Sequence, residues 1–317
     1  MDVVGVGALN LDLIYRVDPL PRGMAPGEER FGDPEDFREL LEHLEAHGEL
    51  LGRSGGGSAA NALVALSRMG FSTGMLGTVG DDPPGEEVLS SLRGVDVGMV
   101  RRTDGTGMCI SLLSRDDRSL LVLPNANDLF RVTKEEILYA GKAEVVHLSS
   151  FSGENALRSQ IELVESLDTS TIVSLDPGEL YAQRGGEIAP LLSRAHVVFP
   201  SEREVEMLTG ATGSEGCRAL LDRGPEMVAC TRGGEGALVV TLDREMVIPP
   251  TRVEPVDCTG AGDVFAASFL AGMLRGWRVE DCGRFACQAS ARSITAYGRD
   301  NYPDEHSLQE FERSMAC

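Results

Sequence analysis

The stretch VDCTGAGDVFAASFLAGML, residues 256–274, places small residues directly before an almost wholly apolar run. The run from 264 to 274 predicts a buried helix, so Gly260, Ala261 and Gly262 are expected around its N-terminus. Unpaired backbone N–H groups and the positive end of the helix dipole make an anion site there without any lysine. Small residues let the anion approach the backbone closely. The stretch therefore predicts an anion-binding turn at the start of a core helix.

Asp263 is the acidic residue of this turn. An aspartate that only caps the helix is unfavourable beside a bound anion, whereas a general base in that place takes a proton from an attacking hydroxyl. The turn and the carboxylate together predict phosphoryl transfer, in which amides stabilise the transferred group and Asp263 activates the acceptor. A helix N-cap with a packing glycine explains the stretch about equally well when it is taken alone.

Composition and charge narrow the class of protein. The chain has 317 residues, 42% of them apolar, and a formal net charge of −21, which argues against nucleic acid or an anionic membrane as partner. Lys134 and Lys142 are the only lysines, a bias that a GC-rich genome or a salty cytoplasm would each produce. The N-terminus lacks the features of a signal peptide, and no apolar run has the ~20 residues that span a bilayer, so we expect a cytoplasmic protein. The seven cysteines include no C-x-x-C pair and predict reduced thiols.

The order of apolar segments predicts the fold class. Short apolar strands such as DVVGVGAL, EVVHLSS, STIVSLD, HVVFP and MVACT alternate with helical segments such as ENALRSQIELVESL. This alternation predicts a three-layer α/β fold, with a mostly parallel sheet and helices on both faces. Residues 12–31 and 99–123 have antiparallel patterns that fit such a sheet poorly, so we expect them to form a small β lid. Residues 33–51 space apolar residues as in an inserted helix, and the whole chain, 1–317, is expected to be one domain.

Other nucleotide and metal motifs are weak or absent. A P-loop requires Gly-Lys followed by Ser or Thr, and Lys142 follows Gly141 but precedes Ala143. Gly5 and Gly7 begin a dinucleotide-like pattern whose third glycine position is Asn10. His43 and His47 lie four residues apart without a third zinc ligand, which favours a solvated helix face.

Residues 256–274 closely resemble the second signature of the ribokinase-like (PfkB) family of sugar and nucleoside kinases. GGGSAANALVALSRMG, residues 55–70, resembles the first signature of that family. GTVGDDPPGEEVLSSL, PSEREVEMLTG and CTRGGEGALVV follow in the family's order, so that the resemblance extends over nearly the whole chain. It implies a kinase of the ribokinase-like fold that uses ATP and Mg²⁺, with K⁺ in many members, and a lid that is often a homodimer interface.

The resemblance also implies roles for matching positions. Asp263 matches the catalytic base, and the residues of the anion hole match Gly260, Ala261 and Gly262. The substrate-binding positions match Asn10, Asp12, Gly56, Gly57 and Asn61, and the loop that lines the ATP site matches Thr231, Gly233 and Gly236. Glu204 matches the glutamate that helps place hydrated magnesium, and Asp257 and Thr259 match positions near the monovalent-cation site. The family usually has asparagine where this chain has Ser201, which puts a contact to metal-bound water or phosphate in doubt.

The acceptor is either a sugar or a nucleoside. Asn10 and Asp12 lie on one face of a strand and resemble the sugar kinases of the family. The insert at 33–51 resembles adenosine kinases, and so do Arg118, which would clamp the phosphates, and Phe151, which would stack on a base. An arginine exposed in a hairpin turn is as good an interpretation of Arg118. We therefore expect phosphorylation of a primary hydroxyl of a small sugar or polyol, with a nucleoside as the alternative. A non-catalytic sensor of the same fold is the rival class, although it would have no need of Asp263.

Overall fold

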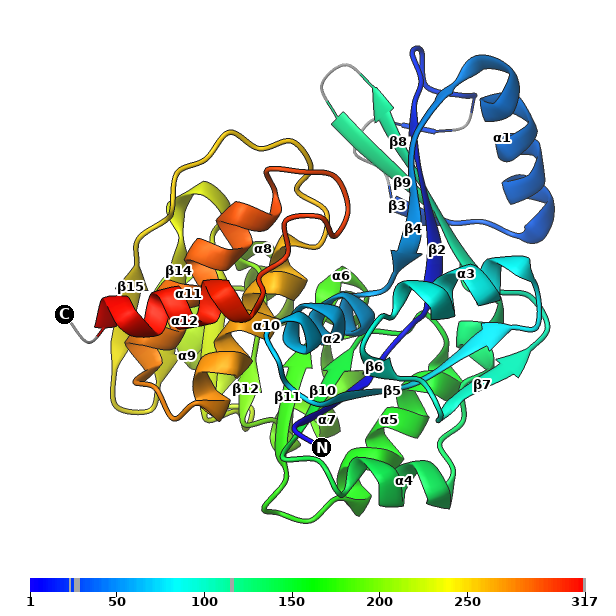
Figure 1. Ribbon diagram of the computed structural model, residues 1–317. Coiled ribbons are helices and arrows are strands. Elements are labelled where there is room, and N and C mark those ends of the chain that lie inside the picture. Colours follow the sequence, from blue (N-terminus) through cyan, green and yellow to red (C-terminus); the bar gives the residue numbers. More distant parts are fainter. Residues whose placement is uncertain (23, 26–28, 115–116, 316–317) are drawn as a thin grey trace.

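The computed structural model describes residues 1–22, 24–25, 29–114 and 117–315, which fold around two β-sheets (Figure 1). The larger sheet has the strand order β15-β14-β13-β12-β11-β10-β1-β5-β6 and is parallel except for β14 and β15. Its strands are β1 (Val3–Val6), β5 (Thr73–Gly80), β6 (Val95–Asp96), β10 (Val145–Ser149), β11 (Ile172–Asp176), β12 (Val197–Val198), β13 (Met227–Thr231), β14 (Ala237–Thr241) and β15 (Glu245–Ile248). The mostly parallel sheet expected from the alternation of strands and helices is confirmed.

Helices cover both faces of this sheet, because successive side chains of each strand point to opposite sides. Val3 and Val145 pack into the core that contains α2 (Ser58–Arg68), α10 (Ala261–Leu274), α11 (Val279–Ser293) and α12 (Glu305–Met315). Val4 and Val146 pack into the opposite core, with α5 (Glu154–Ser166), α7 (Ala189–Arg194), α8 (Glu202–Thr209) and α9 (Gly213–Leu221). Three further helices are α3 (Pro83–Ser91), α4 (Lys134–Ala140) and α6 (Gly178–Arg184). This is the three-layer arrangement that the sequence predicts.

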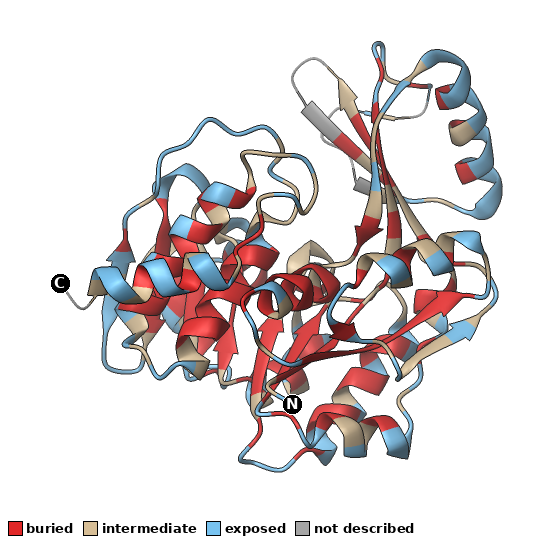
Figure 2. Cartoon of the chain, viewed as in Figure 1, coloured by how far each residue is buried: buried red, intermediate tan, exposed pale blue. Residues whose placement is uncertain are grey.

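The second sheet rises from the body of the molecule (Figure 1). Its strand order is β3-β9-β8-β2-β4, with β2 (Asn10–Arg16), β3 (Glu29–Phe31), β4 (Glu49–Gly56), β8 (Gly107–Ser114) and β9 (Asp117–Leu123). Leu13 and Tyr15 of β2 share a core with Phe37, Leu40 and Leu44 of α1 (Pro34–His47), so α1 covers one face of this sheet. Figure 2 shows that the outer side of α1 is exposed, whereas the central strands of the larger sheet are buried.

Two boundaries differ from those expected. The helix expected over 33–51 ends at His47, and residues 49–56 instead pair with β2 as strand β4. Gly48 is extended and its N–H donates to the carbonyl of Leu44, which closes the helix and turns the chain into the strand. Residues 100–103 form β7, which pairs with β5 rather than joining the lid.

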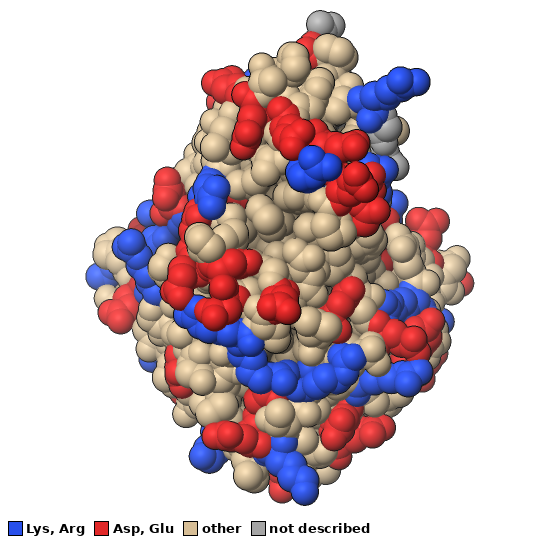
Figure 3. Space-filling model, turned by 90° about the vertical axis from the view of Figure 1, so that its right-hand side faces the viewer, with Lys and Arg blue, Asp and Glu red and all other residues tan. Residues whose placement is uncertain are grey.

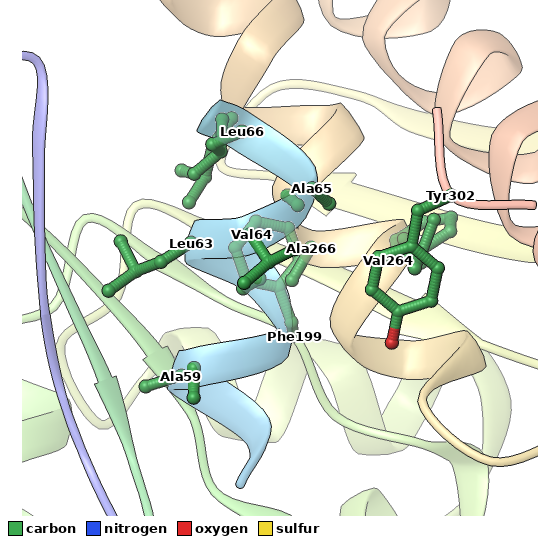
Figure 4. Packing of buried hydrophobic residues seen from close by; sticks show 14 of the residues in the cluster. Ala59, Leu63, Val64, Ala65, Leu66, Phe199, Val264, Ala266 and Tyr302 are labelled. Carbon is green, nitrogen blue, oxygen red and sulfur yellow. The ribbon is translucent and has the colours of Figure 1, made fainter. Parts of the chain in front are cut away.

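α10 is buried on all sides because its sequence is apolar all round. It lies between α2 and α11, and every residue from Asp263 to Gly272 is buried. Figure 4 shows Val64 of α2 beside Ala266 of α10, and the ring of Tyr302 beside Val264 near the start of α10. The N-terminus of α10 is therefore held by a helix from the first quarter of the chain and by a segment near its end.

Charged side chains of both signs share the surface. On the face drawn in Figure 3, Lys and Arg side chains form a row that runs between groups of Asp and Glu side chains. None of the described helices is long and apolar enough to cross a membrane.

Candidate active site

Two cavities meet at the turn that begins α10. One, which we call the acceptor cleft, has a volume of about 370 Å³ and lies between the lid sheet and the body. The other, which we call the donor cleft, has a volume of about 540 Å³. Cys258, Ala261 and Gly262 line both cavities. Molecules bound in the two clefts would therefore meet at this turn, which is the one predicted from the sequence.

The acceptor cleft gathers polar residues that are far apart in the sequence. Asn10 and Asp12 of β2 line it from the lid, and Gly57, Asn61 and Asp263 line it from the body. The alternation of β2 explains this, since Leu11 and Leu13 point into the core while Asn10 and Asp12 face the cleft.

The glycines of the first signature allow close approaches of the backbone. A Cβ on Gly56 would lie 1.9 Å from the Oδ2 atom of Asp12, so a side chain there would displace that carboxylate. Gly57 has a φ of +110°, and its Cβ would lie 2.0 Å from the carbonyl oxygen of Ala8. Gly56 itself does not appear among the lining residues, and we infer that it serves the site by leaving room for Asp12.

Asn127 is a cleft residue that sequence reasoning missed. It lies in the short 3-10 helix η1 (Asn125–Leu129), is 2% exposed and lines the acceptor cleft. Its Oδ1 accepts from the N–H of Leu9 at 2.8 Å, and its Nδ2 donates to Oδ1 of Asn10 at 2.8 Å. Asn127 thereby fixes the orientation of the Asn10 amide. No motif marks it, because its partners lie more than a hundred residues away.

The first turn of α10 leaves amide groups available. Gly260 has a φ of +77°, and the carbonyl oxygen of Gly260 accepts the N–H of Val264. Within the described residues, the backbone N–H groups of Gly262 and Asp263 have no protein acceptor. These two N–H groups lie at the positive end of a 14-residue helix dipole, which is the setting in which proteins bind anions.

Asp263 is buried and held by the first turns of α2. Its Oδ2 accepts from Nδ2 of Asn61 at 2.7 Å. Burial raises the pKa of the Asp263 carboxyl, while hydrogen bonds from Asn61 and Ser58 and the positive charge of Arg299 lower it. A carboxylate with a raised pKa that remains hydrogen-bonded in its charged form is suited to accept a proton.

Two further carboxyl groups, both partly buried, lie in this region. Asp176 ends β11, and burial raises its pKa well above the usual value, with a further increase from the charges of Glu204 and Asp263. Burial also raises the pKa of Glu204. Ser201 and Glu204 form a capping box at the start of α8, in which Oε2 of Glu204 accepts the N–H of Ser201 at 2.8 Å. Both residues thus have a structural role in α8. Asp176 was not singled out in the sequence, although it ends a predicted strand.

The donor cleft is built from the loop after β13, from residues 250–265 and from the C-terminal half of α11. Thr231, Gly233 and Gly236 line it, as expected for that loop, together with apolar side chains that include Phe265 and Ile294. Ser201 pairs with Thr231 in an isolated β-bridge and so lies beside this loop. Asp257 and Thr259 form a turn in which Oδ1 of Asp257 accepts from the N–H and the Oγ1 of Thr259. The carbonyl of Ile294 accepts the N–H groups of Val256 and Asp257, which ties this turn to the donor cleft.

Phe151 and Arg118 are the two positions at which the sequence resembles adenosine kinases. Phe151 is fully buried and stacks on Phe130, with ring centroids 5.1 Å apart and an interplanar angle of 11°. It does not line the acceptor cleft, because the strand that precedes it carries the ring into the core. Arg118 belongs to β9, and its side chain lies outside the described part of the chain.

Comparisons with known proteins agree with this geometry. The model of the pfkB family of carbohydrate kinases matches residues 35–305. A protein of Archaeoglobus fulgidus described as a sugar kinase is 36% identical over 76% of this chain and 98% of its own. The ATP-dependent ribose-1-phosphate kinase of Halopiger xanaduensis is 31% identical over 98% of this chain and 97% of its own. Among solved structures, the adenosine kinase of Sinorhizobium meliloti has a TM-score of 0.84 at 23% identity, and each chain is 98% covered. A ribokinase II of E. coli, solved with ATP and Mg²⁺, has a TM-score of 0.79 at 20% identity, and each chain is 99% covered.

Proposed function

Because the chain belongs to the pfkB family of carbohydrate kinases, we propose that it transfers the γ-phosphoryl group of ATP to a primary hydroxyl of a small sugar or polyol. The observation that carries this proposal is the meeting of two cavities at Ala261 and Gly262, directly beside the buried carboxylate of Asp263. A transfer reaction requires such a shared wall, because the acceptor oxygen and the γ-phosphorus must come within bonding distance.

Asp263 is the general base of the proposed reaction. It accepts the proton of the acceptor hydroxyl, the oxygen attacks the γ-phosphorus in line, and the bond from phosphorus to the leaving oxygen of ADP breaks. The N–H groups of Gly262 and Asp263 point at the place where negative charge develops on the transferred group. The polar side chains of Asn10, Asp12 and Asn61 hold the acceptor hydroxyls.

ATP would occupy the donor cleft, with its base against the apolar side chains and its phosphates toward α10. Asp176 and Glu204 fit magnesium, because two partly buried carboxyl groups of raised pKa lie close enough to act on each other, and Mg²⁺ prefers carboxylate oxygen ligands. When bound, Mg²⁺ neutralises charge on the phosphates. Asp257 and Thr259 offer oxygen atoms for K⁺ behind the anion turn.

The lid sheet closes the acceptor cleft against water, which limits hydrolysis of ATP.

Dimerisation through the lid remains a prediction. Because α1 already covers one face of the lid sheet, that face is buried without a second subunit. Light scattering coupled to size exclusion measures the mass in solution and decides between a monomer and a dimer.

A sugar phosphate is a second candidate acceptor. A third cavity, of about 450 Å³, shares Phe31, Pro124, Ser152 and Leu180 with the acceptor cleft and is also lined by Arg184. The Nη1 atom of Arg184 is buried and has no hydrogen-bond partner among the described residues. Such a group would bind an anionic substituent on the acceptor, and the relative from Halopiger xanaduensis is named for ribose 1-phosphate. A nucleoside is less well supported, since Phe151 lies in the core rather than in the cleft.

The test is a screen of ADP release with pentoses, hexoses, inositol, nucleosides and ribose 1-phosphate, with and without K⁺. We expect saturable, Mg²⁺-dependent ADP release with a sugar or polyol. In the Asp263→Asn variant, we expect kcat to fall by roughly 10²–10⁴-fold, which is the range for loss of a general base, while calorimetry still detects acceptor binding. Near-normal turnover in that variant would contradict the mechanism. Ligand binding by the wild type without ADP release from any acceptor would favour the sensor.

A further inference from the structure

Arg299 lies behind the proposed base and outside both clefts. Its Nε donates to Oδ1 of Asn61 at 3.0 Å, and Nδ2 of the same Asn61 donates to Oδ2 of Asp263 at 2.7 Å. Arg299 lines neither the acceptor cleft nor the donor cleft. The three side chains therefore form a chain of hydrogen bonds that ends on the carboxylate.

The chemistry of the two outer groups determines how the amide between them is oriented. A guanidinium has only donors, and an ionised carboxylate has only acceptors. If the Asn61 amide turned over, its NH₂ group would face the guanidinium and its carbonyl oxygen would face the Asp263 carboxylate. Both contacts would be repulsive, so the orientation with Nδ2 toward Asp263 is the only one that satisfies the chain.

Arg299 is itself fixed by neighbours on two helices. Its Nη1 donates to the carbonyl and to the Oγ of Ser91, at 3.1 and 3.2 Å, and the Nη1 of Arg68 donates to the carbonyl of Arg299 at 2.6 Å. Nη2 is buried and has no hydrogen-bond partner among the described residues. An arginine placed in this way adds a permanent positive charge to the wall behind the catalytic carboxylate.

We propose that Arg299 is a positioning residue for the phosphoryl transfer, which acts by locking the Asn61 amide so that its N–H group faces Asp263. The proposal rests on the assignment of Asp263 as the base. The Asn61 amide thereby holds Oδ2 of Asp263 in a fixed position at the wall of the acceptor cleft.

Other titratable groups also lie near Asp263 and Arg299, and the test must separate their effects from the effect of Arg299. Asp176 faces it from the end of β11, Tyr302 faces it from the C-terminal segment, and Asp12 lies near Arg299 from the lid. The charge of Asp263 helps to raise the pKa of the Asp176 carboxyl. Arg299 is the cation whose charge lowers the pKa of Asp263.

The test compares Arg299→Met with Arg68→Met. Both changes remove an arginine that ties the same C-terminal segment to the body, but only Arg299 contacts Asn61. In Arg299→Met, we expect the acidic limb of the pH profile of kcat/KM to move upward by about one pH unit. In Arg68→Met, we expect lower thermal stability and an unshifted limb. Arg299→Lys keeps the positive charge, so we expect its acidic limb to lie closer to that of the wild type than the limb of Arg299→Met does.

A second measurement does not depend on the acceptor. Aspartate labelled with ¹³C at Cγ reports the titration of Asp263 by NMR, with the signal assigned from its loss in Asp263→Asn. We expect this pKa to rise in Arg299→Met and to stay unchanged in Arg68→Met. Equal pKa values in the wild type and in Arg299→Met would overturn the proposal, even in a protein that phosphorylates no acceptor of the screen. If the pKa rises but no acceptor is phosphorylated, only the proposed function fails.

Discussion

At the scale of single residues, the structure separates two glycines that the sequence treats alike. Gly260 has a φ of +77°, and its Cβ would lie 2.6 Å from the Oη of Tyr302, so the fold requires glycine there. A Cβ on Gly262 would meet nothing within 4 Å, and this residue lines both clefts. Gly260 therefore serves the conformation of the turn, whereas Gly262 leaves open space at the junction of the two clefts, where the proposed reaction would place the phosphoryl group.

Gly262→Ala tests this distinction. Alanine is favoured over glycine within a helix by up to about 1 kcal/mol, so we expect an unchanged or slightly higher free energy of unfolding. The added methyl group would lie where the clefts meet, so we expect kcat/KM to fall by at least about tenfold, equivalent to about 1.4 kcal/mol. Gly186→Ala, at a glycine whose Cβ also meets nothing within 4 Å, is the matched control and should leave activity unchanged. Full activity in Gly262→Ala would show that the phosphoryl group does not approach the backbone at residue 262.

At the scale of elements, local sequence explains how individual helices begin. Asp33 caps α1 by accepting from the N–H groups of Glu35 and Asp36, and the Thr133–Glu136 capping box starts α4. The capping box of Ser201 and Glu204 does the same for α8 beside the donor cleft. The serine that replaces the usual asparagine of the family is thus sufficient for the cap, because both residue types are good N-caps.

Ser201→Ala should lower the free energy of unfolding by about 1 kcal/mol, because the N–H of Glu204 loses its acceptor. Ser201→Asn should keep the free energy of unfolding within a few tenths of a kcal/mol of the wild type. Urea unfolding followed by circular dichroism measures both. An unchanged stability in Ser201→Ala would mean that water replaces the cap at no cost.

At the scale of the whole molecule, one buried titratable group in the central sheet makes the free energy of unfolding depend on pH. His147 lies on β10 and is fully buried, its Nδ1 is 2.9 Å from the Oγ of Ser174, and its Nε2 has no partner among the described residues. Burial lowers the pKa of His147 to about 4. The unfolded chain binds a proton at this histidine below about pH 6.5, whereas the folded chain does not until about pH 4.

The free energy of unfolding should therefore fall as the pH decreases from about 6.5 to 4, by up to about 3 kcal/mol from this residue alone. In His147→Gln, the decrease between pH 7 and pH 5 should be smaller than in the wild type, whatever the absolute stability of the variant. His43→Gln, at an exposed histidine of α1, should keep the decrease of the wild type. Equal pH dependence in all three proteins would exclude His147 as the cause.

The sequence by itself determined the alternation of strands and helices, the buried helix after Gly262, and the turn that exposes its amides. These features depend on residues that are neighbours in the chain, where periodicity and backbone freedom act directly. It also determined that Asn10 and Asp12 share one face of a strand. Strand β4 was missed, because ELLGRSGG has little apolar alternation and becomes a strand only by pairing with β2.

Only the tertiary structure decided which distant residues complete the site. Asn127 meets Asn10, and Arg299 meets Asn61, across 117 and 238 positions of the chain. Such contacts leave no periodic signal, because they depend on how the sheet order and the helix packing bring separate segments together. The burial that raises the pKa of Asp263 has the same origin, since Asn61 of α2 and Tyr302 of the C-terminal segment both act on this residue of α10. The chemistry of the turn is local, whereas the environment that tunes it is a property of the folded chain.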